Sequence, residues 1–351
     1  MTDDGRERDA FKARVDRELT SFVDQEILEL IAVDEQLTPV ADQLRAVTSD
    51  GKRLRAAFCY WGWRAAGQPD CDEMVRAAAA MELVHAAAVV HDDIIDNSPV
   101  RRGVPAAHIA LQGALTGRAG RQAGGRALAM LTGDLLMSWA GQLFTSCGLP
   151  AAYLARARPM WAALARELVA GEVLEILRTG SRPHAQSSLQ VIRYKTAKYT
   201  VEHPLHIGGR LGGGRAALIE VFSAYGLPLG EAFQLRDDLL GIFGDPGATG
   251  KSNADDLVGH KPTTLLAVTW TSATAAERKV LRGLLGRRTL GQEGLDQVRE
   301  IMRRTGAVGR IEELIADRVR AATTAVDRAD LSAPAAAALT GLVGSAVTRQ
   351  S

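Results

Sequence analysis

Two groups of aspartates are the residues of this sequence best suited to bind a metal ion. They are Asp92, Asp93 and Asp96 in HDDIID, and Asp237, Asp238 and Asp245 in RDDLLGIFGD. Each group follows an apolar run whose spacing predicts a helix, which places Asp92 and Asp96 one turn apart on one face. Neighbouring carboxylates repel unless a cation joins them, and Mg²⁺ completes such a site with water and substrate phosphates. A solvated acidic face is the alternative. Because two such groups occur, the sequence favours a site for more than one metal ion.

Basic residues that could bind phosphate lie near both groups. In GKRLR, Lys52 and Arg55 are three residues apart and can share a helix face. The other candidates are Arg101 and Arg102, just after the first group, and Lys195, Lys251 and Lys261 near turn-like breaks. Each alone could be an ordinary surface charge. Together, metal-binding carboxylates and cationic side chains are what recognition of a diphosphate requires.

The elements that must position these residues are amphipathic helices. From Asp72 to about Asn97, apolar residues recur at intervals of three and four. Similar periodicity predicts helices at about 11–31, 127–144, 160–177, 229–243 and 308–326. Aromatic residues make up only 5% and alanine-rich stretches recur, so we expect an all-α protein. The turn-rich breaks at 181–188 and 244–254 are short, which favours one domain over two.

Composition excludes several classes of protein. The chain has 351 residues and a net charge of +1, which gives no overall field for nucleic acid or an anionic membrane. The polar N-terminus lacks the apolar region of a signal peptide, and three cysteines suit a reducing compartment, so we expect a cytoplasmic protein. The apolar stretch at 127–154 contains Asp134, Gln142 and Pro150, which favours a buried helix over a membrane span.

Three other patterns are set aside. GATGKS has Asp245 where a phosphate loop needs glycine, and its upstream segment is helical. GGGRAA at Gly212–Ala217 lacks the strand–helix–strand context of a dinucleotide site. His203 and His206 have no evident third metal ligand, so core histidines are the favoured interpretation.

The ordered set of motifs resembles the trans-isoprenyl diphosphate synthase (polyprenyl synthetase) family, most of all its geranylgeranyl and farnesyl diphosphate synthases. The shared segments are GKRLR, ELVHAAAVVHDDIID, RRG with PAAH behind it, GDLL, KTA, AFQLRDDLLGIFGD, GK and DDLVGHKPTTLL. The resemblance implies the isoprenoid synthase fold, a single-domain bundle of about a dozen or more helices around a central cavity. The domain would span 1–351, with the motifs in a core at about 40–330.

The resemblance also implies roles for individual residues. The ligands of two or three Mg²⁺ ions would be Asp92, Asp96 and Asp237, supported by Asp93 and Asp238. Isopentenyl diphosphate would be held by Lys52, Arg55, His85 and Arg102. The allylic diphosphate would be clamped by Arg101, Lys195, Lys251 and Lys261. Oxygen dipoles would be directed toward the developing carbocation by Thr196 and Gln234.

The implied reaction is a head-to-tail prenyl transfer. Metal ions and basic side chains would stabilise the departing diphosphate, and the isopentenyl double bond would attack the allylic cation. Released diphosphate can accept the proton, which explains why the sequence shows no obvious catalytic base. Family members are usually homodimers.

Product length would depend on the helix that carries the first motif. Short-chain members often carry an aromatic residue where this sequence has Ala87 and Ala88. Val84 and Met81 lie deeper, and Met81 is about 16 Å from Asp92 at 1.5 Å per residue, where it could close the pocket. We therefore expect geranylgeranyl diphosphate as the product, with farnesyl diphosphate as the runner-up and longer chains still open.

The sequence departs from the family pattern at two positions. Ala56 replaces the usual proline after GKRLR, and Glu172 stands where glutamine is common. Two other classes of protein remain as alternatives. A terpene cyclase would normally lack the second D-D-x-x-G motif and the GKRLR segment. A non-catalytic synthase subunit would typically lack one aspartate motif.

Overall fold

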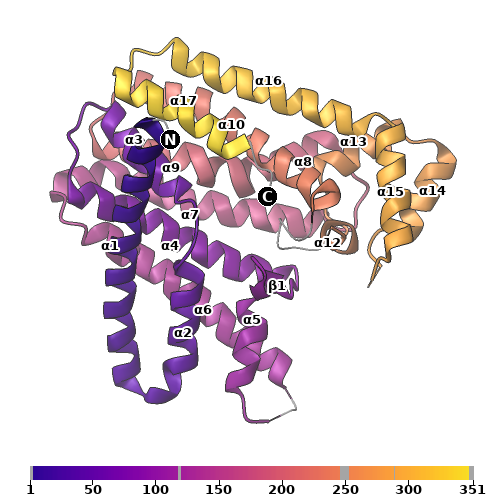
Figure 1. The fold of residues 1–351 in the computed structure, drawn as a ribbon, viewed down its shortest axis with the longest axis horizontal. Coiled ribbons are helices and arrows are strands. Elements are labelled where there is room, and N and C mark those ends of the chain that lie inside the picture. Colours follow the sequence, from indigo (N-terminus) through magenta and orange to yellow (C-terminus); the bar gives the residue numbers. More distant parts are fainter. Residues whose placement is uncertain (1–2, 118–119, 246–252, 288, 348–351) are drawn as a thin grey trace. The chain divides into compact units, whose positions relative to one another are not determined.

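The computed structural model describes residues 3–117, 120–245, 253–287 and 289–347 (Figure 1). Its helices account for nearly all of the regular structure in these ranges. The one sheet found there is an antiparallel hairpin of β1 (Val100–Arg101) and β2 (Val104–Pro105), in which Val100 lies opposite Pro105. The all-α prediction is confirmed.

The chain forms two compact units. Unit 1 comprises residues 1–157 and 207–214, and unit 2 comprises residues 158–206 and 215–351. The expectation of a single domain with a central cavity stays a prediction.

Unit 1 is built around α4 (Asp72–Ile95), which packs most extensively against α6 (Arg121–Thr145) and also contacts α1 and α3. Alanines dominate the buried side of α4, and their small side chains allow the neighbouring helices to approach closely. The remaining elements are α1 (Asp3–Val33), η1 (Glu35–Leu37), α2 (Thr38–Thr48), α3 (Leu54–Ala65), α5 (Ala107–Ala110) and η2 (Leu111–Ala114). The first part of α7 (Ala151–Arg178) and the last part of α9 (His203–Leu211) also belong to this unit.

Unit 2 is organised around α10 (Ala216–Phe243), which packs against α16 (Ala307–Asp327) and η3 (Ile192–Glu202). η3 is a π-helix, and it continues α8 (Ala185–Val191) directly into α9. The other elements are α12 (Asp255–Val258), α13 (Thr264–Ser272), α14 (Ala275–Leu284), α15 (Gln292–Arg304) and α17 (Ala333–Val347). Leucines and isoleucines from α10, α13, α15 and α16 form one buried core.

The observed helices agree with the predicted ones and are mostly longer. The predicted break at 181–188 is only partly correct, because α8 already begins at Ala185. The apolar stretch at 127–154 is largely α6, whose buried residues lie along one face. Among the described helices, α4 alone is long and apolar enough to cross a membrane. That is weak evidence for a span, because 72% of its most apolar window is buried, as in the core helix of a soluble protein.

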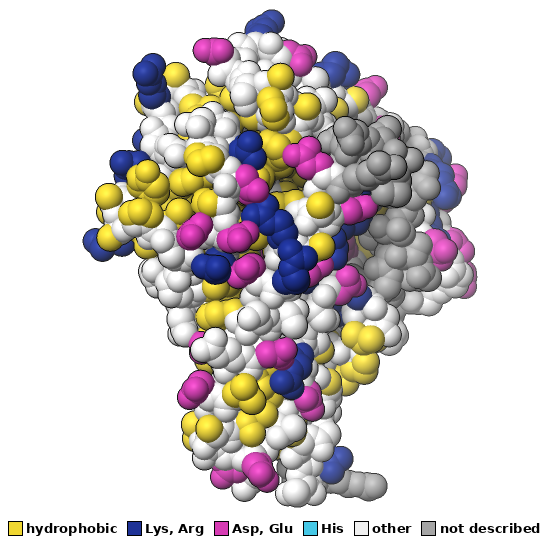
Figure 2. Space-filling model, turned by 60° about the vertical axis from the view of Figure 1, so that its left-hand side comes forward, with side chains coloured by type: hydrophobic (Ala, Val, Ile, Leu, Met, Phe, Trp, Pro, Cys, Tyr) yellow, Lys and Arg dark blue, Asp and Glu magenta, His cyan; other side chains and the backbone are white. Residues whose placement is uncertain are grey.

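On the face shown in Figure 2, basic and acidic side chains lie next to one another rather than in separate fields.

Candidate active site

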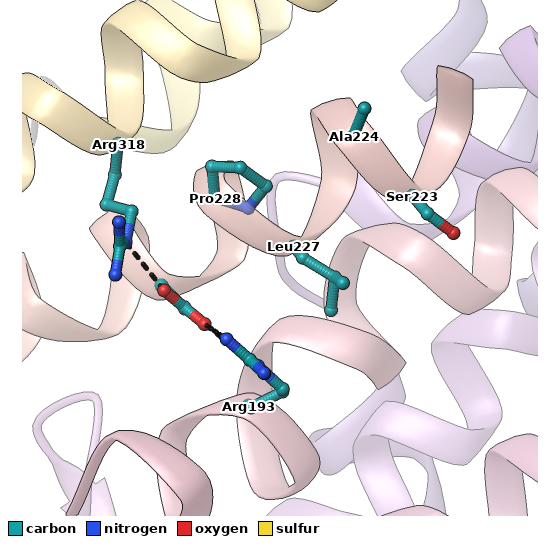
Figure 3. Close-up of a pocket in the computed structure, with 7 residues that line it drawn as sticks. Arg193, Ser223, Ala224, Leu227, Pro228 and Arg318 are labelled. Atoms are coloured by element: carbon teal, nitrogen blue, oxygen red, sulfur yellow. Dashed lines mark hydrogen bonds and ion pairs between the residues drawn. The ribbon is translucent and has the colours of Figure 1, made fainter. Parts of the chain in front are cut away.

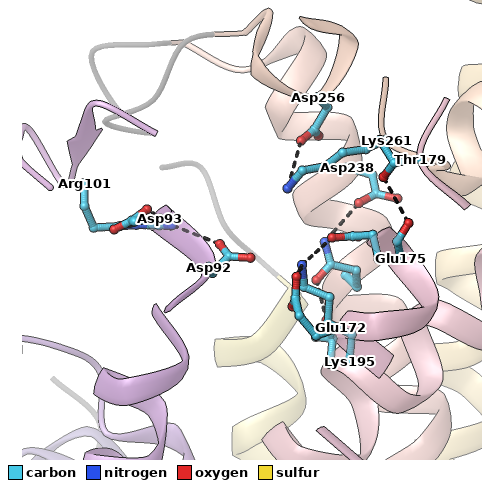
Figure 4. A network of polar contacts seen from close by, with 12 residues as sticks. Asp92, Asp93, Arg101, Glu172, Glu175, Thr179, Lys195, Asp238, Asp256 and Lys261 are labelled. Carbon is cyan, nitrogen blue, oxygen red and sulfur yellow. Dashed lines mark hydrogen bonds and ion pairs between the residues drawn. The ribbon is translucent and has the colours of Figure 1, made fainter. Parts of the chain in front are cut away.

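The first aspartate group lies at the C-terminal end of α4, in unit 1. Asp92 and Asp93 belong to the last helical turn, and Asp96 caps it. Arg101, on β1, donates from Nε to Asp93 Oδ1 at 2.9 Å and from Nη2 to Asp92 Oδ2 at 3.1 Å (Figure 4). The β1–β2 hairpin therefore folds back so that the guanidinium of Arg101 contacts the carboxylates that precede it in the sequence. Burial lowers the pKa of Arg101, but the two carboxylates outweigh this effect and raise its pKa overall.

A basic cluster surrounds His85, one of the residues predicted to hold a diphosphate. Burial lowers the pKa of His85 well below its usual value, and the positive charges of Arg55, Arg102, Arg101 and Arg53 lower it further. His85 is thus a neutral histidine among arginines at pH 7. The structure brings together three of the four residues predicted for isopentenyl diphosphate, namely Arg55, His85 and Arg102. Lys52 lies exposed, three residues before Arg55.

Arg53 belongs to this cluster and was not predicted. It has a left-handed backbone conformation, with φ of 52°, immediately before α3. Its guanidinium binds Asp16 Oδ1 at 2.6 Å and the carbonyl of Thr48 at 2.8 Å. The carbonyl of Asp50 accepts from both Arg53 and Arg102. Arg53 therefore fixes the conformation of the GKRLR turn. Its position between Lys52 and Arg55 in the sequence could have indicated that it belongs to the same cluster.

The departure at Ala56 has a structural counterpart. The backbone N–H of Ala56 donates to the buried carboxylate of Glu82 at 2.9 Å. Proline has no N–H and could not make this bond. Glu82 lies one turn before His85 on α4, so the bond ties the first turn of α3 to the helix that carries the first aspartate group.

The second aspartate group lies near the end of α10, in unit 2. Asp238 is buried, and its Oδ2 has no hydrogen-bond partner. Burial raises the pKa of Asp238 to about 8, and the negative charges of Asp256, Asp237 and Glu175 add to the effect. Gln234 partly opposes it by donating from Nε2 to Asp238 Oδ1 at 3.0 Å. The result is a crowd of carboxylates in which one member is held neutral at pH 7 in the absence of a cation.

Gln234 connects this group to η3. Thr196 donates from Oγ1 to Gln234 Oε1 at 2.8 Å, so the Gln234 amide is oriented by Thr196 at one end and by Asp238 at the other. Two residues predicted to act on a carbocation are thereby brought into contact, and Gln234 is anchored to a predicted metal ligand.

Lys195 is held by two carboxylates of α7. Its Nζ lies 3.0 Å from Glu172 Oε2 and also binds Glu175 (Figure 4). Lys195 lies within the π-helix η3, whereas the sequence suggested a position near a turn-like break. The departure at Glu172 therefore matters, since a glutamine there would remove one negative charge that binds Lys195.

The remaining predicted clamp residues are Lys261 and Lys251. Lys261 Nζ lies 4.0 Å from Asp256 Oδ1. Lys251 lies outside the described residues, as does most of the GATGKS string. In the described part of the chain, no three His, Cys, Asp or Glu side chains are already gathered to hold a metal ion.

The residues predicted to set product length are on α4 but differ in exposure. Ala87, Val84 and Met81 are buried in unit 1 (0%, 1% and 1% exposed). Ala88 is partly exposed, as are His85, Val89 and Asp92 at helical spacing. Of the four predicted residues, Ala88 alone shares the accessible stripe that leads back from Asp92.

His203 and His206 lie buried, in accord with the interpretation as core histidines. His203 Nε2 lies 3.3 Å from Glu167 Oε2, which also binds Lys198 at 2.8 Å. Burial lowers the pKa of His203 to about 4, although Glu167 acts in the opposite direction.

A separate pocket of about 280 Å³ lies in unit 2, beside residues 223–228 of α10 (Figure 3). Glu231 there is buried and accepts from Arg193 of η3 at 2.8 Å and from Arg318 of α16 at 2.6 Å. These contacts tie three helices together. No predicted site residue lines this pocket.

Comparison with known proteins agrees with this arrangement. A family model described as polyprenyl synthetase matches residues 38–302. The chain belongs to the polyprenyl synthetase family. A geranylgeranyl diphosphate synthase of Saccharolobus solfataricus is 30% identical over 260 residues, which cover 73% of this chain and 74% of that one. A (2E,6E)-farnesyl diphosphate synthase of Mycobacterium tuberculosis is 32% identical over 258 residues, covering 72% and 67%.

A solved structure extends the likeness over nearly the whole chain. The geranylgeranyl pyrophosphate synthase of Corynebacterium glutamicum, complexed with isoprenyl diphosphate and magnesium, has a TM-score of 0.91 and 32% identity. The match covers 97% of this chain and 98% of that one. The isoprenoid synthase fold implied by the motifs is confirmed. The polyprenyl synthetase relatives make products of different length, so the family does not by itself fix chain length.

Proposed function

We propose that this protein is a Mg²⁺-dependent prenyltransferase that joins isopentenyl diphosphate head to tail to an allylic diphosphate, with geranylgeranyl diphosphate as its main product. The observation that carries the proposal is the state of Asp238. A buried carboxylate with an unpartnered oxygen, crowded by three other carboxylates, is unfavourable until a divalent cation joins the group. Its place in the D-D-x-x-G motif of a polyprenyl synthetase supports the proposal.

The metal ligands would be Asp92, Asp96 and Asp237, supported by Asp93 and Asp238. These residues offer only carboxylate oxygens, which is the ligand chemistry that Mg²⁺ prefers. Bound Mg²⁺ would neutralise the charge that develops on the leaving diphosphate. The magnesium and isoprenyl diphosphate in the structure of the Corynebacterium glutamicum relative support this assignment.

The basic cluster around His85 would hold isopentenyl diphosphate. Lys52, Arg55 and Arg102 supply positive charge, and a neutral His85 can donate one hydrogen bond to a phosphate oxygen. Burial and the positive charges of Arg101 and Arg53 lower the pKa of Arg102, although the nearby Asp50 opposes this. An anion bound there would relieve that repulsion.

The allylic diphosphate would be bound by Arg101, Lys195, Lys251 and Lys261. Arg101 and Lys195 are engaged with carboxylates, so binding requires them to share or exchange these partners. Thr196 and Gln234 would direct oxygen atoms toward the allylic cation. Because Thr196 donates its proton to Gln234, its own oxygen lone pairs remain available for this role. Released diphosphate would take the proton.

We propose a geranylgeranyl product because Ala88 leaves the accessible stripe of α4 open beneath Asp92. Farnesyl diphosphate remains the alternative, and relatives of both kinds are known. Longer products would require that side chains of other helices leave the path open beyond Met81.

We also propose that the protein is a cytoplasmic homodimer that does not span the membrane. In unit 2, α7 exposes Val169, Val173, Ile176 and Leu177 at helical spacing (60%, 46%, 47% and 74% exposed). A contiguous apolar stripe of this kind suits a self-complementary interface. Three free cysteines are consistent with a reducing compartment. Light scattering should show a dimer, and Val173→Glu should yield monomers.

The decisive experiment is incubation of the pure protein with isopentenyl diphosphate, an allylic primer and Mg²⁺, followed by mass analysis of the products. Elongated prenyl diphosphates that disappear when EDTA is added would support the proposal. A cyclic hydrocarbon would identify a terpene cyclase instead. Absence of turnover with every primer would point to a non-catalytic subunit.

A further inference from the structure

The last turn of α4 rests on α6 at a notch made by a glycine. A Cβ added to Gly133 would lie 2.2 Å from His91 Nε2, so the His91 ring occupies the space of a missing side chain. His91 Nε2 lies 3.2 Å from the carbonyl of Met130, to which it can donate, and 3.4 Å from Asp134 Oδ1. A glycine inside a helix costs up to about 1 kcal/mol relative to alanine. Here it makes room for the residue directly before Asp92.

A second contact between the same helices lies just beyond the aspartates. Arg126 of α6 donates from Nη2 to the carbonyl of Ile94 at 2.6 Å and from Nη1 to Asn97 Oδ1 at 2.9 Å. Ile94 is in the final turn of α4, where carbonyls lack helical partners and a positive charge is favourable. Asn97 has a left-handed conformation, with φ of 53°, that ends the helix. Arg126 therefore fixes both the last turn and the residue after it.

We infer that His91, Gly133 and Arg126 are positioning residues for the first aspartate group. His91 contacts α6 directly before Asp92, and Arg126 of α6 binds the backbone of Ile94 and the side chain of Asn97 on either side of Asp96. Mg²⁺ demands near-ideal octahedral geometry, so small shifts of this turn should weaken binding strongly. The inference rests on the proposed function, because it assumes that these aspartates bind the metal.

The test uses the full chain and two matched pairs of variants. Arg126→Lys keeps the charge but cannot reach both acceptors, and Arg121→Lys is its control at an exposed position of α6. Gly133→Ala fills the notch, and Gly141→Ala is its control, because nothing lies within 4 Å of a Cβ added to Gly141. Electron paramagnetic resonance would follow Mn²⁺ binding in the presence of inorganic diphosphate, and thermal unfolding without metal would be measured in parallel.

We expect Arg126→Lys and Gly133→Ala to raise the Mn²⁺ dissociation constant about tenfold, the usual effect of disturbing residues that orient metal ligands. The two controls should change it less than twofold. Turnover at low Mg²⁺ should fall in Arg126→Lys and Gly133→Ala and should recover as the Mg²⁺ concentration is raised. A general loss of folded protein would not recover in this way.

Unchanged Mn²⁺ binding in both test variants would overturn the inference, even if their thermal stability fell. If Gly133→Ala did not fold, Arg126→Lys would decide alone. Prenyl transfer by the unmodified protein is measured separately, so failure of the proposed function would appear there and not in the comparison between variants.

Discussion

Gly171 of α7 lies so close to η3 that a Cβ at this position would be 2.3 Å from the backbone nitrogen of Lys195. The clash would be with backbone atoms, which cannot move aside as a flexible side chain can. The absence of a side chain at Gly171 therefore allows the two helices to place Lys195 beside Glu172 and Glu175.

We expect Gly171→Ala to push η3 away from α7 and to displace Lys195. Overpacking of this kind costs about 1–3 kcal/mol of the free energy of unfolding. Gly309→Ala in α16 is the control, because nothing lies within 4 Å of a Cβ added there. Urea unfolding and the Michaelis constant for the allylic substrate would be measured. Equal behaviour of the two variants would contradict the close packing of Gly171 against the backbone of Lys195.

Replacing Glu172 by glutamine should strengthen binding of the allylic diphosphate. Lys195 would lose the carboxylate of Glu172 as an ion-pair partner and become more available to phosphate. A partly exposed ion pair contributes up to about 1 kcal/mol. If that free energy no longer competes with phosphate binding, the Michaelis constant should decrease about two- to fivefold. Glu220→Gln removes the same charge from an exposed position of α10 and should have no such effect. A Michaelis constant that rises in Glu172→Gln would show that Glu172 assists binding.

A bulky side chain at position 88 should shorten the product. Ala88 lies on the accessible stripe one turn before Asp92, so a phenylalanine there would occupy the path of the growing chain. Chromatography of the dephosphorylated products should show a shift toward farnesol in Ala88→Phe and none in Ala88→Ser. If the distribution stays the same, the chain does not follow this stripe.

Acid should destabilise unit 2 through His203. Its pKa is lowered to about 4 by burial, whereas an unfolded histidine titrates near 6.5. The unfolded state therefore binds a proton first as pH falls, and stability is lost between about pH 6.5 and pH 4. For this one residue the expected loss from pH 7 to pH 5 is about 2 kcal/mol. Glu167, Lys198 and His206 also act on this histidine and would set the final size of the effect.

Urea unfolding at pH 7 and pH 5 would test this prediction. The difference in midpoint between the two pH values should shrink in His203→Gln. The exposed His184 provides the control, and His184→Gln should keep the difference of the unmodified protein. A difference that is the same in all three proteins would exclude His203 as its source.

Sequence reasoning reached the helical class and the polyprenyl synthetase family because both depend on patterns within short segments. The period of apolar residues predicts a helix wherever one face is buried, and the aspartate motifs are contiguous. For the same reason, the breaks were less accurate. Residues 181–188 all have a composition typical of turns, yet α8 begins within them, at Ala185, with His184 as its N-cap.

Contacts between distant segments could not be predicted in the same way. Nothing near Lys195 in the sequence indicates that Glu172 and Glu175 bind it, and Arg126 is 29 residues from Asn97. The partial exposure of Ala88 beside a buried Ala87 depends on which helices pack around α4. Such relationships arise from tertiary packing, whereas residue types and spacing record only what each segment can do.

The π-helical winding of η3 has a consequence for how this enzyme could be altered. α8, η3 and α9 form one uninterrupted run from Ala185 to Leu211, and the wider turns in its middle accommodate more residues per turn than an α-helix would. Deleting one residue there, with the winding of the rest unchanged, would rotate everything on one side of the deletion by up to about 100°. Lys195 and Thr196 could then no longer keep their present directions together with the histidines of α9. The segment from Ala185 to Leu211 should therefore tolerate substitutions far better than the insertion or deletion of a single residue.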